Sequence, residues 1–309
     1  MELGERLKKS RYSDSAEILS KLAKDDLPCV RRNVAENPNT LAETLASLAN
    51  DQNRTVRYAV AENPHTPVKT LSDLAKDQID SVRCMVAKNP HTPAKTLSEL
   101  AKDQDYVVRS MVAGNPHTPT EILSDLALSD VRYEVAKNPN TPAEILYNFA
   151  KDPDGWVRAK VAENPNTSAE LLVQLAKDQY YRVRGEVAKN PNTPAEILYN
   201  FAKDPDGWVR AKVAENPNTS EEIMFNLVKD QYYLVRVGVS ENMNTSPETL
   251  SELAKDQDYR VRVAVALNPH TSPETLSFLA KDQEVDVRDG AEQNLSRKQA
   301  EDESAEMSM

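Results

Sequence analysis

Hydrophobic positions recur along the chain at a fixed interval, and each repeat contains two short amphipathic segments. In the first segment the apolar residues are spaced i, i+1, i+4, i+5, as in residues 145–150, which is one buried stripe of a helix. The second segment carries Val157 and Val161 and reaches Asn164-Pro165. Because proline disfavours the α region for the residue before it, the pattern predicts that this second helix ends there.

The dipeptide Val-Arg marks each repeat. It occurs eleven times, at intervals of 26 except for one of 23, with its valine at Val30, Val56, Val82, Val108, Val131, Val157, Val183, Val209, Val235, Val261 and Val287. Residues 134–168 also recur without change as residues 186–220. Helices of about ten residues do not fold alone, so neighbouring repeats must bury each other's stripes. The sequence therefore predicts an all-α solenoid.

We predict eleven two-helix repeats over residues 14–294, an N-terminal cap segment over residues 1–13, and a polar, disordered tail over residues 295–309. The first helix often follows a Thr-Pro pair, as at Thr141-Pro142, and threonine there is expected to be the N-cap. The second helix is expected to be the shorter one, with partly 3₁₀ geometry.

Three elements of the repeat, Leu-x-x-Leu-Ala-x-Asp, Val-Arg-x-x-Val-Ala and Asn-Pro-x-Thr-Pro, resemble those of the variant leucine-rich repeat (LRV) family. The Asp-x-x-x-x-x-Arg part also resembles HEAT repeats, which belong to the armadillo-like α-solenoids. The resemblance implies a right-handed superhelix of paired helices. The repeats of this chain are slightly longer than those of the family, which allows the second helix to be longer as well. Some relatives carry a cysteine-ligated iron–sulfur module, but this chain has no cysteine cluster, so we expect no cofactor.

Composition and charge argue against several classes of protein, namely nucleic-acid-binding, disulfide-bonded and membrane proteins. The 309 residues include 39% hydrophobic and 28% charged residues, with a net charge of -11, which disfavours non-specific binding to a phosphate backbone. Cys29 and Cys84 fall two repeats apart, too far for a disulfide. No segment approaches the roughly 20 apolar residues of a membrane span, and residues 1–10 lack the apolar core of a signal peptide. We therefore expect a cytoplasmic protein with no membrane contact.

Three polar columns repeat along the array. The arginine of each Val-Arg follows an aspartate by six residues in ten repeats, as Asp152 precedes Arg158, and this spacing predicts an ion pair within each repeat. The asparagine of Asn-Pro is expected to satisfy backbone groups of the turns within and between repeats. Four histidines occupy the residue after Asn-Pro, about 10 Å apart, which is too far to share a metal ion: His65, His91, His117 and His270.

Aromatic residues gather in the loop before Val-Arg, mostly in the later two-thirds of the chain: Tyr106, Trp156, Tyr180, Tyr181, Trp208, Tyr232, Tyr233 and Tyr259. Two interpretations stay open. Each ring can cover the gap between neighbouring loops, or the rings can form a contact surface, since Tyr and Trp anchor protein interfaces. These eight residues are the candidate binding site.

One repeat, which we call the short repeat, lacks three residues before Val131-Arg132 and leaves Asp130 only two places before the arginine. The shortened loop predicts a local bend, or is a tolerated surface deletion.

Function is predicted from the absence of any catalytic motif and from the repetition of nearly every polar column. We expect a non-catalytic scaffold that binds a protein partner through its concave face or its aromatic loop edge. The alternative is a HEAT-like protein that binds nucleic acid or processes DNA bases, which requires a positive concave face. An accessory subunit of an enzyme is a third possibility that the sequence does not separate from the first.

Overall fold

The computed structural model of the chain describes the backbone of residues 1–307 and the side chains of residues 1–301. Within residues 1–307 the chain forms 23 helices and no strands, which confirms the all-α prediction. The helices form two compact units, Met1–Leu146 and Tyr147–Met309.

The first unit contains α1 and five complete helix pairs. Its helices are α1 (Leu3–Tyr12), α2 (Ala16–Leu22), α3 (Pro28–Glu36), α4 (Ala42–Leu48), α5 (Arg54–Glu62), α6 (Val68–Leu74), α7 (Asp80–Lys88), α8 (Ala94–Leu100), α9 (Tyr106–Gly114), α10 (Thr120–Leu126), α11 (Arg132–Lys137) and the beginning of α12 (Ala143–Phe149).

The second unit begins within α12 and continues the same alternation. Its further helices are α13 (Gly155–Glu163), α14 (Ala169–Leu175), α15 (Tyr181–Lys189), α16 (Ala195–Phe201), α17 (Gly207–Glu215), α18 (Glu221–Leu227), α19 (Tyr233–Glu241), α20 (Pro247–Leu253), α21 (Tyr259–Leu267), α22 (Pro273–Leu279) and α23 (Val285–Met307).

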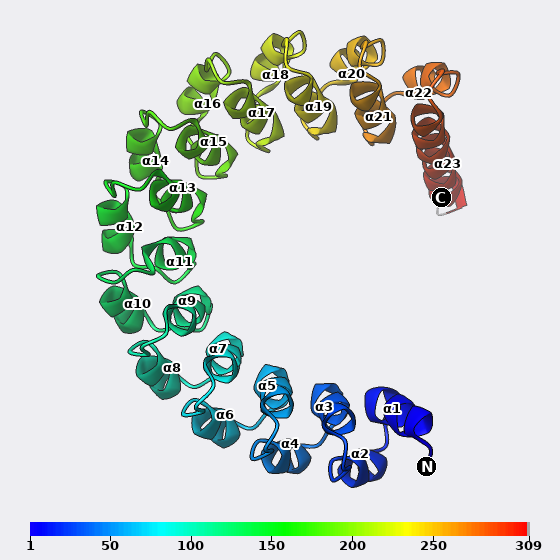
Figure 1. Cartoon of the computed structure of the whole chain (residues 1–309). Coiled ribbons are helices and arrows are strands. Elements are labelled where there is room, and N and C mark those ends of the chain that lie inside the picture. The colour runs from blue at the N-terminus through cyan, green and yellow to red at the C-terminus, as the bar shows by residue number, and fades with distance from the viewer. Residues whose placement is uncertain (308–309) are drawn as a thin grey trace. The chain divides into compact units, whose positions relative to one another are not determined.

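Each repeat consists of an even-numbered helix followed by an odd-numbered helix, and the pairs α2–α3 to α22–α23 are the eleven predicted repeats. Within each unit the odd-numbered helices pack closely against one another and lie on the inner side of its curve (Figure 1). Leucines of the even-numbered helices, such as Leu172 and Leu198, and valines of the odd-numbered helices, such as Val183 and Val187, are fully buried. The core therefore lies between the two rows of helices.

The prediction of a short second helix with partly 3₁₀ geometry is wrong. The second helices of the full-length repeats are α-helices, mostly of nine residues, whereas the first helices have seven. They are longer because residues assigned to the loop join the helix, which begins two residues before Val-Arg. In α13 the carboxylate of Asp154 accepts a hydrogen bond from the Trp156 amide (2.8 Å) and so caps this added turn.

The predicted role of the Thr-Pro threonine is also corrected. The N-cap is the following residue, for example Pro119 or Ser168, and the buried threonine hydroxyl donates to a carbonyl in the last turn of the preceding helix. Thr118 Oγ1 thus donates to the carbonyl oxygen of Val112 at 2.6 Å. The last carbonyls of a helix have no partner within it. This bond therefore caps the C-terminus of the odd-numbered helix, not the N-terminus of the even-numbered one.

The two ends of the chain are helical. The predicted cap segment, residues 1–13, contains α1, which packs against α2 and α3, and Arg6 pairs with Asp25 at 2.8 Å. The tail predicted as disordered instead continues α23 as far as Met307. Leu295 stands there in place of the proline that follows the second helix of every other repeat except that of α19, and good helix formers come after it. The end of the predicted tail, residues 308 and 309, lies outside the described residues.

The arginine column pairs with the next repeat, which corrects the prediction of pairing within a repeat. Arg158 Nε and Nη2 donate to the two carboxylate oxygens of Asp178, twenty residues later, at 2.6 and 3.0 Å. Its Nη1 donates to the backbone carbonyl of Asp152, six residues earlier, at 2.7 Å. The same fork joins Arg31–Asp51, Arg57–Asp77, Arg83–Asp103, Arg184–Asp204, Arg210–Asp230, Arg236–Asp256 and Arg262–Asp282. We call this set the Arg–Asp ladder.

The asparagine column connects turns in the predicted way, both within and between repeats. Asn190 Nδ2 donates to the carbonyls of Ala162 and Asn164 in the preceding repeat, at 2.7 and 3.1 Å. Its Oδ1 accepts from the Asn192 amide at 2.9 Å. The histidines take the position of Asn192 in other repeats, and their side chains are exposed at these turns.

The short repeat loses the first turn of its second helix rather than a piece of loop. Its helix α11 has six residues and begins at Arg132, whereas α9 begins two residues before its Val-Arg. Arg109 still reaches the next aspartate, with Nη2 at 2.8 Å from Asp130 Oδ2, but the Asp130 side chain is 55% exposed. The ladder contact at this repeat is therefore more open to water than the others.

The first prediction concerns the ladder. Arg184→Ala removes a fork to Asp204 and leaves that carboxylate buried, so we expect the free energy of unfolding to fall by about 2 kcal/mol. Arg288 is the matched control, since it lies in the last repeat and its guanidinium donates to the backbone carbonyls of Asp282 and Gln283 in its own repeat. Urea denaturation followed by circular dichroism should give a clearly smaller loss for Arg288→Ala. Equal losses would contradict the stabilising role of the fork between repeats.

The second prediction concerns pH. Burial tends to raise the pKa of Asp178, but hydrogen bonds from Arg158 and the Tyr180 amide outweigh it and lower the pKa below its ordinary value. The pKa values of Asp51, Asp77, Asp103 and Asp282 are lowered in the same way. Stability from a lowered pKa is complete above the unfolded value, about 3.9, and is lost as pH falls through the folded value.

We therefore expect the urea midpoint to fall steeply as pH drops below about 4. The variant Asp178→Asn should be less stable at pH 7 and should lose less of its remaining stability over the same range. A wild-type midpoint that stays constant between pH 5 and pH 2 would exclude the ladder carboxylates as the cause of acid unfolding.

Candidate functional site

The predicted aromatic residues lie where even-numbered helices connect to odd-numbered ones, at the N-terminal ends of the odd-numbered helices. Seven of the eight belong to the second unit, and we call them the aromatic edge: Trp156, Tyr180, Tyr181, Trp208, Tyr232, Tyr233 and Tyr259. The eighth, Tyr106, is the first residue of α9 in the first unit. The structure thus brings together residues from five successive repeats and places Tyr106 separately.

Six rings of the aromatic edge form edge-to-face contacts, in one group of four and one pair. Trp156 and Tyr180 have ring centroids 6.0 Å apart, Tyr180 and Tyr181 5.5 Å, and Tyr181 and Trp208 5.9 Å. Interplanar angles of 72–89° in these three pairs are typical of the T-shaped geometry that aromatic pairs prefer. Tyr232 and Tyr233 form a second such pair at 5.7 Å.

Glycines of the preceding repeat provide the surface on which these rings lie. A Cβ atom on Gly185 would stand 1.7 Å from Trp208 Cζ3, and one on Gly155 would stand 2.7 Å from Tyr180 Cδ1. Gly207 receives the ring of Tyr232 in the same way, with a corresponding distance of 2.8 Å. Close approach of a ring to the backbone, rather than an unusual backbone angle, explains glycine at these positions.

The other face of the rings remains accessible to solvent. Trp156 is 48% exposed and Tyr259 is 44% exposed, while the remaining five members are partly buried. Tyr180, Trp208 and Tyr232 thus cover glycines of the preceding repeat and are partly exposed, whereas Trp156 and Tyr259 are exposed.

Two arginines lie against the rings. The guanidinium carbon of Arg182 is 4.9 Å from the Trp156 ring centroid and 5.5 Å from that of Tyr181. The guanidinium carbon of Arg260 is 3.6 Å from the Tyr233 ring, and its Nε and Nη2 donate to Asp258 at 2.9 and 2.7 Å. Cation–π contacts of this kind hold the rings and cations in fixed positions.

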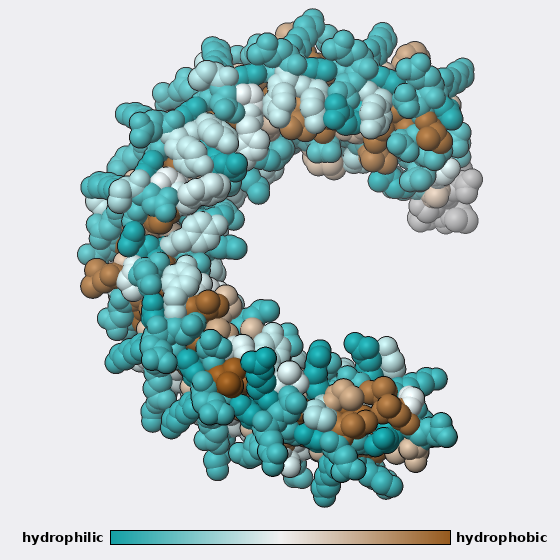
Figure 2. All heavy atoms as spheres, in the orientation of Figure 1, coloured by the Kyte–Doolittle hydropathy of each residue, from teal (hydrophilic) through white to brown (hydrophobic). Residues whose placement is uncertain are grey.

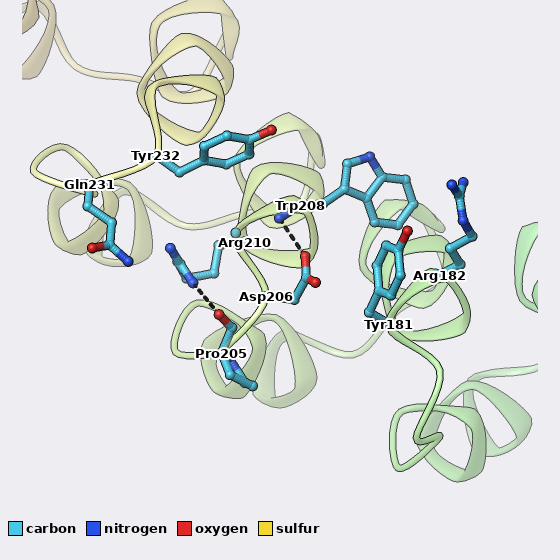
Figure 3. Close-up of a pocket in the computed structure, with 9 residues that line it drawn as sticks. Tyr181, Arg182, Pro205, Asp206, Trp208, Arg210, Gln231 and Tyr232 are labelled. Carbon is cyan, nitrogen blue, oxygen red and sulfur yellow. Dashed lines mark hydrogen bonds between the residues drawn. The ribbon is translucent and has the colours of Figure 1, made fainter.

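An open groove of about 630 Å³ lies between the Trp208 and Tyr232 rings (Figure 3). Tyr181 and Arg182 extend its Trp208 side, and Gln231 lies beside Tyr232. Its other lining residues are Pro205, Asp206, Gly207 and Arg210. Arg210 belongs to the Arg–Asp ladder, and the hydrogen bonds from its guanidinium to Asp230 raise its pKa. The groove therefore offers aromatic surface and paired charges, a combination suited to binding.

The sequence identified the rings of this groove but not the residues that position them. Gly185 and Gly207 were not singled out, although glycine is rare in the chain and each precedes an aromatic residue by slightly less than one repeat. Asp206 was also missed, and it fixes the start of α17 by accepting from the Trp208 amide at 2.8 Å. The Asp-Gly-Trp sequence, present twice, was the signal available.

Neither a metal site nor a membrane-spanning helix is present among the described residues. No group of three or more His, Cys, Asp or Glu residues in that part of the chain is arranged to hold a metal ion. Among the helices of residues 1–307, none combines the length and the apolar character needed to cross a membrane.

Two segments of the chain match a known protein family. The model of the leucine rich repeat variant family matches residues 155–179 and 259–284. This confirms the resemblance drawn from the Leu-x-x-Leu-Ala-x-Asp and Val-Arg elements, and the residues matched include Trp156 and Tyr259 of the aromatic edge. No curated protein matches the chain.

Several solved structures are similar to this chain. One is described as a leucine-rich repeat variant with a novel repetitive structural motif; it is 25% identical, the match covers 83% of this chain and 87% of that one, and the TM-score is 0.41. An engineered protein is 15% identical over 96% of this chain and 98% of its own, with a TM-score of 0.32. Yeast importin-β (Kap95p) is 12% identical over 93% of this chain and 46% of its own, with a TM-score of 0.36.

The third prediction tests the glycine beneath Trp208. In a Trp156→Phe background, where Trp208 is the sole tryptophan, Gly185→Ala should displace the indole and shift its fluorescence emission to longer wavelength. Gly114→Ala is the control, because a Cβ there meets nothing within 4 Å and alanine favours a helix. An unchanged emission spectrum in Gly185→Ala would show that the indole does not lie on Gly185.

Proposed function

We propose that this chain is a non-catalytic scaffold that binds a protein partner along its aromatic edge, at the groove between Trp208 and Tyr232. The observation that carries the proposal is the row of tyrosine and tryptophan rings, three of which lie on glycines of the preceding repeat and all of which are partly or largely exposed. Trp, Tyr and Arg are the residues that dominate the binding energy of protein interfaces, and all three line this groove.

Preorganisation strengthens this proposal. Binding costs free energy when flexible side chains must be ordered, by about 0.5–1.5 kcal/mol for each. Tyr181 and Trp208 are already fixed by their edge-to-face contact, and Arg182 is fixed against Tyr181. These groups therefore lose little freedom when a partner covers them.

The repetition of the polar columns supports binding rather than catalysis. A catalytic site needs a unique arrangement of acids, bases or nucleophiles, whereas the arginines and aspartates here recur in nearly every repeat and form the Arg–Asp ladder. The groove itself contains Asp206, whose carboxylate caps α17, and Arg210, which is paired with Asp230. Each of these groups has a structural role that accounts for its position.

Charge disfavours the nucleic-acid alternative. The chain carries a net charge of -11, and charged residues on the inner helices pair with each other, as Lys212 does with Glu215 at 2.6 Å. Single-stranded nucleic acid binds through stacked rings together with a positive groove, whereas the charges lining this groove are Arg182, Asp206 and an Arg210 paired with Asp230. We therefore favour a protein partner.

We also propose a cytoplasmic location. Cys29 is exposed and Cys84 is buried, and neither is in a disulfide. Burial raises the pKa of the Cys84 thiol to about 11, which keeps it protonated and unreactive. Unpaired thiols are typical of proteins that stay in a reducing compartment.

The fourth prediction tests the proposed function by affinity capture. The full-length chain is immobilised, exposed to a lysate of its source cells, and the captured proteins are quantified by mass spectrometry. Trp208→Ala combined with Tyr232→Ala should reduce recovery of the specific partner at least tenfold, because both walls of the groove are removed.

Tyr12→Ala is the matched control, since Tyr12 is 73% exposed on α1 and lies outside the aromatic edge. Trp208→Phe, which keeps an aromatic ring on Gly185, should retain most of the binding. Recovery of the same proteins by the double variant would overturn the proposal. Capture of nucleic acid that is released by salt would instead favour the alternative.

A further inference from the structure

A second surface lies on the even-numbered helices of the same unit, away from the aromatic edge. One exposed position in α12, α14, α16 and α18 carries a large apolar residue: Tyr147 (46% exposed), Val173 (37%), Tyr199 (42%) and Phe225 (65%). These residues follow one another at intervals of 26, so they occupy the same place in four successive repeats. We call them the apolar column. The face of the molecule drawn in Figure 2 is mainly hydrophilic, with scattered hydrophobic patches.

The apolar column is specific to these four repeats. The corresponding residue is serine or alanine in other repeats, at Ser20, Ala46, Ser72, Ser98, Ser124, Ser251 and Ser277. Duplication of residues 134–168 accounts for the likeness of Tyr147 and Tyr199, but Val173 and Phe225 lie outside the duplicated block. Their exposure rules out a role in the core, and apolar surface that recurs in register is typical of an interaction site.

Charged columns flank the apolar column on both sides. Three residues earlier in each helix stands an exposed glutamate, and four residues later stands an exposed lysine, as Glu196 and Lys203 flank Tyr199. Residues at these spacings share one face of a helix. The Lys203 ammonium lies 4.4 Å from the Tyr199 ring centroid, and Lys151 lies 4.2 Å from that of Tyr147. The remaining flanking residues are Glu144, Glu170, Glu222, Lys177 and Lys229.

A fourth column differs in the same four repeats. The residue after each apolar one is a neutral amide, at Asn148, Gln174, Asn200 and Asn226, where most other repeats carry an acid, as at Asp73, Glu99, Asp125 and Glu252. One such acid, Glu252, pairs with Lys229 of the preceding repeat at 3.2 Å. The amides place no carboxylate at this position beside Lys151, Lys177 and Lys203, whose exposed ammonium groups can attract the carboxylates of a partner.

We infer that the apolar column binds an amphipathic helix of a partner protein, with apolar residues at heptad spacing, acidic residues along one flank and basic residues along the other. The acidic flank faces the lysine column and the basic flank faces the glutamate column. This is the charge arrangement by which flanking positions select partners in helix–helix pairs. The site is distinct from the aromatic edge and does not depend on the function proposed for it.

The length of the apolar column supports a helix as the occupant. The even-numbered helices lie on the outer side of the unit's curve, so successive members of the column are at least about 10 Å apart. An occupant that contacts all four members is therefore elongated, and a helix of about 20 residues or more spans the roughly 30 Å involved. A membrane surface fits less well, because the glutamate column would repel anionic lipid headgroups.

The fifth prediction tests this inference with a defined probe. The probe is a fluorescein-labelled peptide of three heptads with leucine at positions a and d, glutamate along one flank and lysine along the other. Its binding to the full-length chain is measured by fluorescence anisotropy. Tyr199→Ser combined with Phe225→Ser, which installs the residue found in other repeats, should weaken binding at least tenfold. Lys177→Glu combined with Lys203→Glu should also weaken it, by a factor that shrinks at high salt.

Phe278→Ser is the matched control, because Phe278 is 54% exposed on α22 and lies outside the apolar column. This variant, and Trp208→Ala with Tyr232→Ala, should bind the peptide as the wild type does. Absence of binding to the wild type at millimolar protein, or equal binding by the Tyr199→Ser, Phe225→Ser variant, would overturn the inference. The inference would also be overturned if the wild type bound phosphatidylserine–phosphatidylcholine vesicles but not the peptide, and if the Tyr199→Ser, Phe225→Ser variant lost this vesicle binding.

Discussion

The array depends on hydrogen bonds that each repeat completes only with its neighbour. Arg158 uses Nη1 to hold the backbone of its own loop at Asp152, while Nε and Nη2 hold the carboxylate of Asp178 in the next repeat. Asn190 likewise donates to carbonyls of the repeat before it. A repeat alone would leave these buried groups without partners, at a cost of about 1–3 kcal/mol for each. Helices as short as α14 and α15 are stable only in this context.

Most of the fold could be predicted from the sequence, because the regular recurrence of Val-Arg is unambiguous. The asparagine column was understood correctly, since its bonds lie near turns that the Asn-Pro dipeptide already marks. The arginine column was assigned the wrong partner, because the aspartates on either side of Arg184, Asp178 before it and Asp204 after it, recur with equal regularity in the sequence. Only atomic positions, which place Arg184 Nε 2.7 Å from Asp204 Oδ2, decide between them. Similarly, the disordered tail was predicted from polarity, although the absence of a proline after Asn294 allows the helix to continue.

The sequence predicted which aromatic residues form the candidate site, but not the contacts that position them. Aromatic residues before Val-Arg were evident, whereas the ring contacts across repeats, and the glycines that make room for them, require atomic positions such as that of Trp208 over Gly185. The apolar column was not predicted, because aromatic residues are denser in the loops before Val-Arg than on the first helices. Comparison of a single helix position between repeats, with Tyr199 and Phe225 against Ser251 and Ser277, was the signal that the sequence offered.

A double-mutant cycle on the ladder tests the central claim most directly. Arg184 is replaced by alanine alone and together with Asp204→Asn or Asp178→Asn, and the free energy of unfolding is measured for each variant. Pairing between repeats predicts a coupling of about 1 kcal/mol or more between Arg184 and Asp204, and a clearly smaller one between Arg184 and Asp178. A larger coupling to Asp178 would show that the arginine pairs within its own repeat, and would contradict the account of how the repeats are joined.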